Sequence, residues 1–427
     1  MSSRGAVALL AVLAALASSA PAAATTATVL GIGPTTRSLA GAGVTQAVGY
    51  EAAFLNPAGL VLTPGTTLSA GYGVTSAWLY TQRGSQPERR FDTKPLGATE
   101  LGFTLPFELF QQRFVLGFAG SSPGGSVAEA DLPLAETPQF PRLLSRQRAV
   151  DFDLALAVRP LKFLAFGVGV RALSTLSGTA EVERTKQTTS TRVSDTLAPV
   201  LAPLAGVTAF FGSRATLALV ARAPLRADFD IQLGAVDLGA TQLPPLNLAG
   251  LAHYDPLAIQ AEYAQRLGPL EAMFGAVYQR FRATPTLLPR TVSCPAERPD
   301  CLALTASSPQ FHDTFDLHVA ATLSLAVTRS ASAKLRAGYA FVPSPIPEQA
   351  ASENLLDGAR HRLGLGYGLT LSDPLPPLGL DCALTFDQLV ARTSKKQPAV
   401  AQDNLGSPTL RARGHLLGFS LGLTVRL

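Results

Sequence analysis

Histidines are the side chains best suited to proton exchange near neutral pH, and this chain has five of them. They are His253, His312, His318, His361 and His415. Asp316 and His318 are two residues apart, so on a strand they share one face and the carboxylate could orient the ring. No serine stands in a recognisable nucleophile setting beside them, and a solvated pair is the plainer interpretation. We therefore expect no catalytic residue and no enzymatic activity.

The sequence also lacks the motifs of metal and cofactor sites. The sequence contains neither His-x-x-x-His nor Cys-x-x-Cys, and its acidic residues are not clustered as a calcium loop requires. No glycine-rich phosphate loop stands between a strand and a helix. We expect no metal site and no cofactor.

The three cysteines suggest an oxidising compartment. Cys294 and Cys301 have six residues between them, in a stretch with proline and charge, a spacing that allows a short loop disulfide. Two unpaired thiols are the alternative. Cys382 alternates with Leu380 and Leu384 on an apolar face, which predicts an inert thiol that is buried or faces lipid.

Residues 1–24 have the features of a secretory signal peptide. Arg4 supplies the positive charge, Ala6 to Ala17 form an apolar stretch too short to span a bilayer, and Ala22-Ala23-Ala24 offers a cleavage site. A buried N-terminal helix is the alternative, but apolar residues surround that helix on all sides. We expect the protein to be exported.

Composition narrows the class further. The chain is 47% hydrophobic and only 15% charged, with a mean hydropathy of +0.23, yet after the N-terminus it lacks the ~20 unbroken apolar residues of a membrane helix. A net charge of +5 could suggest nucleic acid, but the 35 lysines and arginines are scattered singly. We expect no nucleic-acid partner.

The elements that must position these residues alternate with a period of two. In the segment from Asp151 to Arg159, large apolar side chains oppose Asp151, Asp153 and small residues. The last stretch, from Gly414 to Leu427, has leucine, phenylalanine and valine on one face and mostly glycine, serine and threonine on the other. Apolar faces toward lipid and small polar faces toward a lumen are typical of a membrane β-barrel. A soluble all-β envelope protein is the alternative.

Short and long connections alternate along the chain, as in outer-membrane barrels with tight periplasmic turns and long external loops. The short links are Phe107 to Gln112, Arg159-Pro160-Leu161, Gly212-Ser213-Arg214, Tyr254-Asp255-Pro256, Thr328 to Ser332 and Asp373 to Leu378. The long links are Arg83 to Pro95, Ser121 to Arg146, Thr175 to Ala198, Ala227 to Pro245, Thr284 to Phe311, Pro343 to Arg360 and Thr393 to Arg413.

Counting between these links predicts an all-β fold, a transmembrane antiparallel β-barrel of about fourteen strands over residues 66–427. Both termini then lie on the periplasmic side. Leu257 to Phe281 is long for one strand and contains Gly268-Pro269; we treat it as a single bent strand, because splitting it would make the count odd.

Residues 25–65 precede the first strand, and their glycines break any regular element. The segments Arg37-Ser38-Leu39-Ala40-Gly41-Ala42-Gly43-Val44-Thr45-Gln46-Ala47 and Glu51-Ala52-Ala53-Phe54-Leu55-Asn56-Pro57-Ala58-Gly59-Leu60 resemble the N-terminal hatch of the FadL/TodX outer-membrane transporters. Pro57 fixes φ and Asn56 can cap the turn through its side chain. The resemblance implies that this segment plugs the lumen.

A second region is similar to the same family. It runs from Gly338-Tyr339-Ala340-Phe341-Val342-Pro343-Ser344-Pro345-Ile346-Pro347 through Asp357-Gly358-Ala359-Arg360-His361 to the strand Leu363 to Leu371. The family also carries Pro and Gly near a kink that opens the barrel wall sideways. Here Pro123, Gly124 and Gly125 end the third expected strand and are the corresponding candidates.

The resemblance implies an outer-membrane transporter that captures hydrophobic solutes, such as long-chain fatty acids, in an apolar pocket. The hatch would then move and the solute leave sideways, along a path shaped by Gly41, Gly43, Phe54, Asn56, Pro57 and Ala58. Expected partners are hydrophobic small molecules (fatty acids, lipids, detergent), outer-membrane lipid and the barrel-assembly machinery, with the protein a monomer. A scaffold or binding role without transport is the alternative.

Overall fold

A computed structural model describes residues 31–123, 138–143, 150–184, 189–236, 246–285, 310–350, 353–373, 376–397 and 408–427. Side chains within the strands are described except at 123, 174–198 and 228–252. The predicted signal peptide therefore lies outside the described residues. Within the described residues, no helix combines the length and apolar composition needed to cross a membrane.

Fourteen antiparallel strands form a closed ring, which confirms the predicted barrel and its strand count. In ring order they are β1 (Thr67–Arg83), β3 (Leu96–Leu109), β4 (Gln112–Pro123), β5 (Asp151–Leu161), β6 (Leu164–Arg184), β7 (Thr189–Phe211), β8 (Ala215–Arg222), β11 (Ala258–Leu267), β12 (Leu270–Gln279), β13 (Thr314–Ala326), β14 (Ala331–Val342), β15 (Arg360–Leu371), β16 (Leu378–Lys395) and β17 (Thr409–Arg426). The first and last strands close the ring with seventeen residue pairs, from Thr67↔Arg426 to Arg83↔Leu410.

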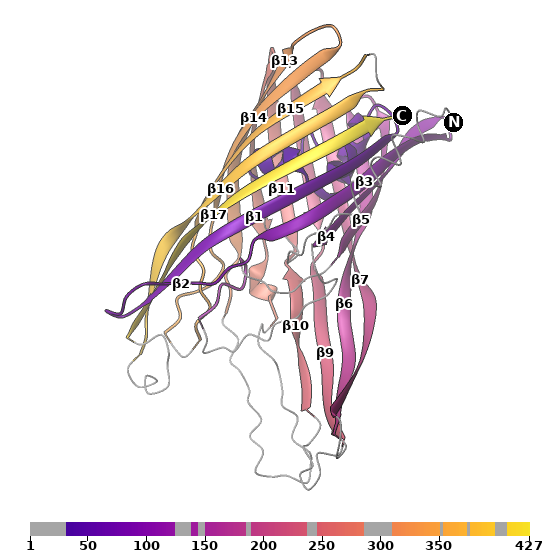
Figure 1. Cartoon of the computed structure of the whole chain (residues 1–427). Helices are drawn as coiled ribbons and strands as arrows, with labels where there is room; N and C mark the ends of the chain where they lie inside the picture. Colours follow the sequence, from indigo (N-terminus) through magenta and orange to yellow (C-terminus); the bar gives the residue numbers. More distant parts are fainter. Residues whose placement is uncertain are drawn as a thin grey trace.

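The two ends of the barrel differ (Figure 1). The C-terminus and the start of β1 lie at one end, where neighbouring strands are joined by short turns such as Phe110-Gln111 and Gly268-Pro269. The strand ends that the long connections join lie at the opposite end. This arrangement matches the predicted alternation, and we refer to the two ends as periplasmic and external.

The segment from Leu257 to Phe281 is not one bent strand, as the sequence suggested. It is the hairpin of β11 and β12, which pair from Ala258↔Gln279 to Leu267↔Leu270 around a two-residue turn. Gly268 has a φ of +63°, in the left-handed region where glycine has no steric penalty.

A compensating error keeps the count at fourteen. The predicted links place a wall strand between Pro245 and Tyr254, but β10 (Leu246–Asp255) pairs with β9 (Leu225–Val236), and β8 pairs directly with β11. The turn Tyr254-Asp255-Pro256 accordingly lies at the external end. The β9–β10 hairpin is thus an external excursion between two neighbouring wall strands.

The long link predicted from Thr175 to Ala198 is also largely strand. β6 and β7 pair continuously beyond the barrel, out to Arg184↔Thr189, and β9 pairs in parallel with the extended part of β6. Figure 1 shows β6, β7, β9 and β10 projecting together past the external end. A further short strand, β2 (Arg89–Arg90), pairs with the external part of β1.

The wall has an apolar outer face and a small or polar inner face. In β13, Phe315, Leu317 and Val319 are exposed on the outside, whereas Asp316 and His318 are buried on the inside. Aromatic pairs flank the apolar band: Trp78 stacks on His415 toward the external end, and Phe107 stacks on Phe114 toward the periplasmic end. Two aromatic girdles are typical of membrane barrels.

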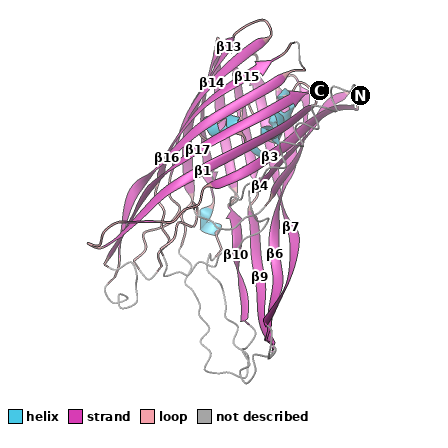
Figure 2. Ribbon diagram, viewed as in Figure 1, coloured by secondary structure: helices cyan, strands magenta, loops and turns pink. Residues whose placement is uncertain are grey.

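The described part of the predicted hatch lies inside the ring (Figure 2). It contains two short helices, α3 (Pro34–Ser38) and α4 (Gly49–Leu55), and the 3-10 helix η1 (Pro57–Leu62). α4 and η1 contact β4 and β5, and α3 contacts β15 and β16. Residues of α4 and η1 share a buried apolar cluster with wall residues such as Val115 and Val220.

Candidate functional site

Asn56 organises the turn between α4 and η1. Its side chain Oδ1 accepts a hydrogen bond from Ala58 N at 3.1 Å, and Nδ2 donates to Val44 O at 2.7 Å and to Thr208 Oγ1 of β7 at 2.9 Å. The side chain is fully buried. The cap expected from the sequence is therefore present, and the same amide also ties the hatch to the wall.

Two paired glycines in the wall make room for this turn. Gly167 of β6 lies opposite Gly206 of β7. A Cβ at position 167 would lie 2.2 Å from Pro57 C and Ala58 N, and one at position 206 would lie 2.2 Å from Asn56 Oδ1. Real Cβ atoms do not approach so closely, so the turn can sit against the wall only where both side chains are absent.

Glycines make room for the hatch at other positions of the wall as well. At six further wall glycines, an added Cβ would lie within 2.5 Å of a hatch atom. They are Gly73 (beside Arg37), Gly102 (Tyr50), Gly117 (Leu60), Gly338 (Leu39), Gly364 (Ser38) and Gly366 (Ser38). Together the wall glycines form what we call the glycine socket.

Two buried wall carboxylates hold the hatch backbone. Glu100 of β3 accepts hydrogen bonds from Gly33 N at 2.8 Å and from Tyr50 Oη at 3.2 Å, and it pairs with the Arg37 guanidinium at 2.5 Å. Because Arg37 and Glu100 are both buried, removing either would leave an uncompensated buried charge.

Glu262 of β11 binds the glycine-rich loop in the same way. It accepts hydrogen bonds from Gly43 N at 2.7 Å and from Thr45 N at 2.9 Å, and His318 Nε2 lies 3.2 Å from its Oε2. Gly41 and Gly43 both have positive φ, +94° and +101°, which explains the need for glycine at these two predicted path residues.

A third carboxylate belongs to the hatch. Glu51 of α4 is buried and accepts hydrogen bonds from Thr36 N at 2.8 Å and Thr35 N at 3.2 Å, at the start of α3. Burial raises the pKa of the Glu51 carboxyl to about 7, although the hydrogen bonds from Thr36 oppose the shift. This residue joins the two helices of the hatch.

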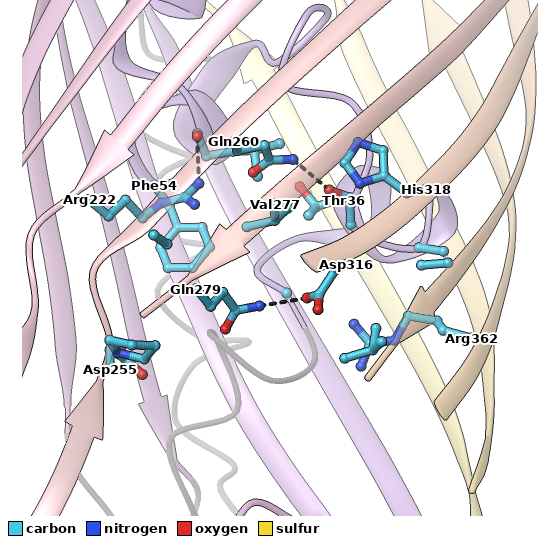
Figure 3. A pocket seen from close by; sticks show the side chains of 18 of the residues that line it. Thr36, Phe54, Arg222, Asp255, Gln260, Val277, Gln279, Asp316, His318 and Arg362 are labelled. Carbon is cyan, nitrogen blue, oxygen red and sulfur yellow. Dashed lines mark hydrogen bonds between the residues drawn. The ribbon is translucent and has the colours of Figure 1, made fainter. Parts of the chain in front are cut away.

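A cavity of about 160 Å³ lies between the hatch and the external half of the wall (Figure 3). Its apolar lining includes Phe54, Leu55, Val277, Ala258 and Val342. Polar and charged side chains from six wall strands and β10 complete it: Arg171, Arg222, Asp255, Gln260, Gln279, Asp316, His318 and Arg362. The cavity is therefore amphipathic.

Most of the cavity's charges already have partners. Arg171 pairs with Asp151, Asp153 and Asp255 at 2.7, 3.3 and 3.0 Å. Arg362 pairs with Asp387. The alternation predicts that Asp151 and Asp153 face the lumen, and there the structure buries both beside Arg171.

Arg222 differs from the other cavity arginines. Its Nη2 donates to Leu55 O at 2.7 Å, and its guanidinium lies 5.6 Å from the Phe54 ring centre. Within the part of the chain that the structure describes, it forms no ion pair, and its buried Nε has no hydrogen-bond partner. Arg222 and Phe54 thus present a cation beside an apolar surface.

The second motif region closes the external side of the lumen. Ser344 Oγ donates to Asp357 Oδ2 at 2.8 Å, and Arg142 Nη1 donates to the same oxygen at 3.2 Å. Phe281, Phe311, Ile346 and Leu355 pack beneath these loops, and Arg142 lies over the Phe281 ring. Ser344 and Asp357 therefore connect three external segments.

The remaining predicted residues fall elsewhere. Pro123 is the last residue of β4 and pairs with Ala98 of β3; Gly124 and Gly125 lie outside the described residues, as do Cys294 and Cys301. The kink and the disulfide stay predictions. Cys382 is a free thiol on β16, and Asp316 binds Gln279 rather than His318.

Sequence reasoning missed Glu100, Glu262 and Glu51, which hold the hatch. A signal was present: Glu100 and Glu262 are single carboxylates within apolar alternating strands. Local alternation assigns them no partner, because the hatch backbone groups that they bind are 67 to 219 residues away along the chain.

Comparisons with known proteins support the fold. No protein-family model matches the chain, and no curated protein matches its sequence. Among solved structures, a FadL homologue from Pseudomonas aeruginosa superposes with a TM-score of 0.62 at 14% identity, covering 96% of this chain and 99% of that chain.

Two further solved structures are similar to this chain. The toluene transporter TodX of Pseudomonas putida has a TM-score of 0.54 at 12% identity, covering 92% of this chain and 97% of that chain. The toluene transporter TbuX of Ralstonia pickettii has a TM-score of 0.53 at 14% identity, with 93% and 99% covered. The resemblance read from the sequence is therefore confirmed at the level of the fold.

Proposed function

From the FadL/TodX fold of this chain, we propose that it is an outer-membrane transporter that takes up hydrophobic solutes. The observation that carries the proposal is the amphipathic cavity of about 160 Å³ on the external side of a hatch seated in the lumen. An apolar cavity of about 150 Å³ suffices to hold benzene. The cavity thus has room for one aromatic ring or part of an alkyl chain.

Capture in such a cavity is favoured by the hydrophobic effect. An apolar solute gains about 25 cal/mol for each Å² of apolar surface that leaves water. Phe54, Leu55 and Val277 offer that contact, whereas a water-filled channel would offer none. The solute then has to pass the hatch, which requires the contacts of Glu100, Glu262 and Asn56 to loosen. In this proposal it leaves sideways into the bilayer.

The chemistry of the cavity favours an amphiphile with a negative head over a neutral hydrocarbon. Arg222 supplies a cation without an ion-pair partner among the described residues, next to the Phe54 ring. A carboxylate at Arg222 would satisfy that charge while its chain lies against Phe54 and Leu55. Long-chain fatty acids have this form, and we propose them as the solute class.

The barrel accounts for the proposed location and partners. The apolar outer band with its two aromatic girdles fits an outer membrane, and the β1–β17 pairing leaves no open edge in the ring. We therefore propose a monomer, inserted by the barrel-assembly machinery. The similar solved structures are described as transporters and channels, in keeping with a protein that is not an enzyme.

Uptake of labelled solutes by cells with and without the gene tests the proposal. We expect faster uptake of a long-chain fatty acid with the gene, and a loss of that gain in Arg222→Gln and Phe54→Ala. Arg214→Gln, an exposed arginine at a periplasmic turn, is the matched control. Equal uptake with and without the gene would favour the scaffold role. Faster uptake of toluene alone, unchanged by Arg222→Gln, would contradict the fatty-acid class.

A further inference from the structure

A cluster of cations lies on the outer face of the barrel, just beyond the external aromatic girdle. Tyr80 of β1 is flanked by Arg413 of β17 on one side and by Arg90 of β2 on the other. Two residues further out, Gln82 of β1 lies opposite Arg411. Figure 1 shows β1, β2 and β17 side by side at this end.

Alternation along the strands places these side chains outside the lumen. In β17, Leu410, Ala412 and Gly414 are buried on the inside, whereas Arg411 and Arg413 are exposed. The outward row of β1 runs from the apolar band through Trp78 to Tyr80, so the arginines lie where bilayer head groups begin.

The aromatic side chains hold the arginines against the wall. Trp78 stacks on His415 with ring centres 5.2 Å apart, and the Arg90 guanidinium lies 6.0 Å from the Trp78 ring centre. The Arg413 guanidinium lies 5.1 Å from the Tyr80 ring centre. Guanidinium groups stacked on rings keep their N–H donors free to bind an anion.

One carboxylate competes for this cluster. Glu88 Oε1 and Oε2 accept hydrogen bonds from Arg413 Nε and Nη2 at 2.6 and 2.5 Å. Arg413 nevertheless remains 49% exposed. Three arginines against one glutamate leave the surface positive at the level of the head groups.

We propose that this surface, formed by Arg90, Arg411 and Arg413 with Trp78 and Tyr80, binds the phosphate groups of an outer-leaflet lipid. Arginine forms paired hydrogen bonds with phosphate oxygens, and the rings lie at the depth where a lipid's acyl chains meet its head group. A bound lipid would fix the β1–β17 closure of the ring in the outer leaflet. The proposal rests on the proposed outer-membrane location and is independent of the transported solute.

The chain's single tryptophan, Trp78, lies within the surface and reports on it directly. The experiment embeds the whole protein in phosphatidylcholine nanodiscs and follows tryptophan emission as the fraction of diphosphorylated lipid A increases. Parallel titrations use lipid A without its phosphates and inorganic phosphate. We expect a saturable change with the diphosphorylated lipid alone.

Substitutions of the charged residues test whether this surface binds the lipid. Arg90→Gln, Arg411→Gln and Arg413→Gln combined should weaken lipid binding roughly a hundredfold, because each arginine near a charged surface contributes about a factor of five. Glu88→Gln should tighten binding about fivefold. Arg214→Gln with Arg329→Gln, at the periplasmic turns, should change nothing.

Three results would overturn the proposal. They are equal binding of the lipid without phosphates, full competition by inorganic phosphate, and unchanged binding in the combined arginine variant. Since Glu88→Gln removes only an exposed ion pair, it tests the surface even if the combined variant were not to fold. Solute uptake plays no part in the readout, so failure here and failure of the transport proposal are separable.

Discussion

Asn56 shows how one side chain can fix both the shape and the position of the hatch. Its amide caps η1 at Ala58, and its two N–H donors bind Val44 in the hatch and Thr208 in the wall. Asn56→Ala should weaken hatch docking by about 1–3 kcal/mol, because the buried acceptors lose their donor. Faster hydrogen exchange at Ala58 N, which donates to Asn56, would report it.

Thr208→Val is the matched control for that change. It removes the wall acceptor alone and keeps the cap, so exchange at Ala58 should rise less than in Asn56→Ala. If Asn56→Ala left the exchange of the hatch amides as in the wild type, the amide would not be what holds the turn.

Glu51 makes docking of the hatch depend on pH. The pKa of its carboxyl is about 7 when the hatch is docked, above the ordinary value of 4.5 that it regains in water. The docked state thus binds the proton more tightly, so this contribution is complete below pH 4.5 and lost as pH rises through 7. We expect greater ion conductance through the barrel at pH 8 than at pH 5 in planar bilayers.

Glu51→Gln should flatten this dependence, since the amide stays uncharged across the range. Glu108→Gln, an exposed glutamate at the periplasmic end of β3, should keep the wild-type profile. Conductance that rises toward low pH would contradict the assigned direction.

At the scale of elements, the hatch depends on wall strands that lack side chains where it touches them. Gly167→Val and Gly206→Val each place a side chain where hatch atoms lie 2.2 Å from the new Cβ. We expect the hatch turn to be displaced and small polar solutes to leak through an otherwise folded barrel. A dye-release assay from proteoliposomes measures the leak.

Gly379→Val provides the control, because a Cβ there lies 3.6 Å from Thr424 and meets no hatch atom. Both kinds of variant should keep the heat-modifiable gel migration of a folded barrel. Tight barrels in the Gly167 and Gly206 variants would show that the hatch does not need the glycine socket.

The β9–β10 hairpin tests which strands make the wall. Because Arg222 of β8 pairs with Ala258 of β11, replacing residues 225–255 with a Gly-Ser-Gly link should leave the ring closed. Heat-modifiable migration of the purified variant checks this. Loss of that migration would show that β10 is needed as a strand of the barrel wall.

Whether a feature of the fold could be predicted depends on how far along the chain the residues that determine it lie. Alternation and turn residues are local, so the barrel and the end that carries the short turns could be predicted from the sequence. The number of fourteen agrees only because two wrong strand assignments cancel. Partner choice is not local: β10 resembles a wall strand, and only the β8–β11 pairing shows that it is not one. Gly268-Pro269 was a turn signal, but it was outweighed by the even count.

The residues of the candidate site also separate into those that local sequence could predict and those that it could not. The turn at Asn56, Pro57 and Ala58 and the glycines at 41 and 43 could be found, because a hatch needs local backbone chemistry. Glu100 and Glu262 could not be assigned, since their partners are set by how the hatch seats in the closed ring. Arg222 could not be singled out either, because its place beside Phe54 depends on the folded hatch.

At the scale of the whole molecule, the fold combines a lipid-facing barrel with a plug held by glycines, carboxylates and one amide. The plug contacts strands on opposite sides of the ring, from β4 and β5 to β15 and β16. In the proposed transporter, this combination would provide a route for apolar solutes that stays closed to polar ones.

The most direct test compares the whole chain with a variant that lacks residues 25–63 in proteoliposomes. Two quantities are measured side by side: entry of a labelled long-chain fatty acid and leakage of a small polar dye. We predict that the intact protein admits the fatty acid and retains the dye, while the variant releases the dye at once. Equal dye retention by both proteins would contradict the plugged transporter.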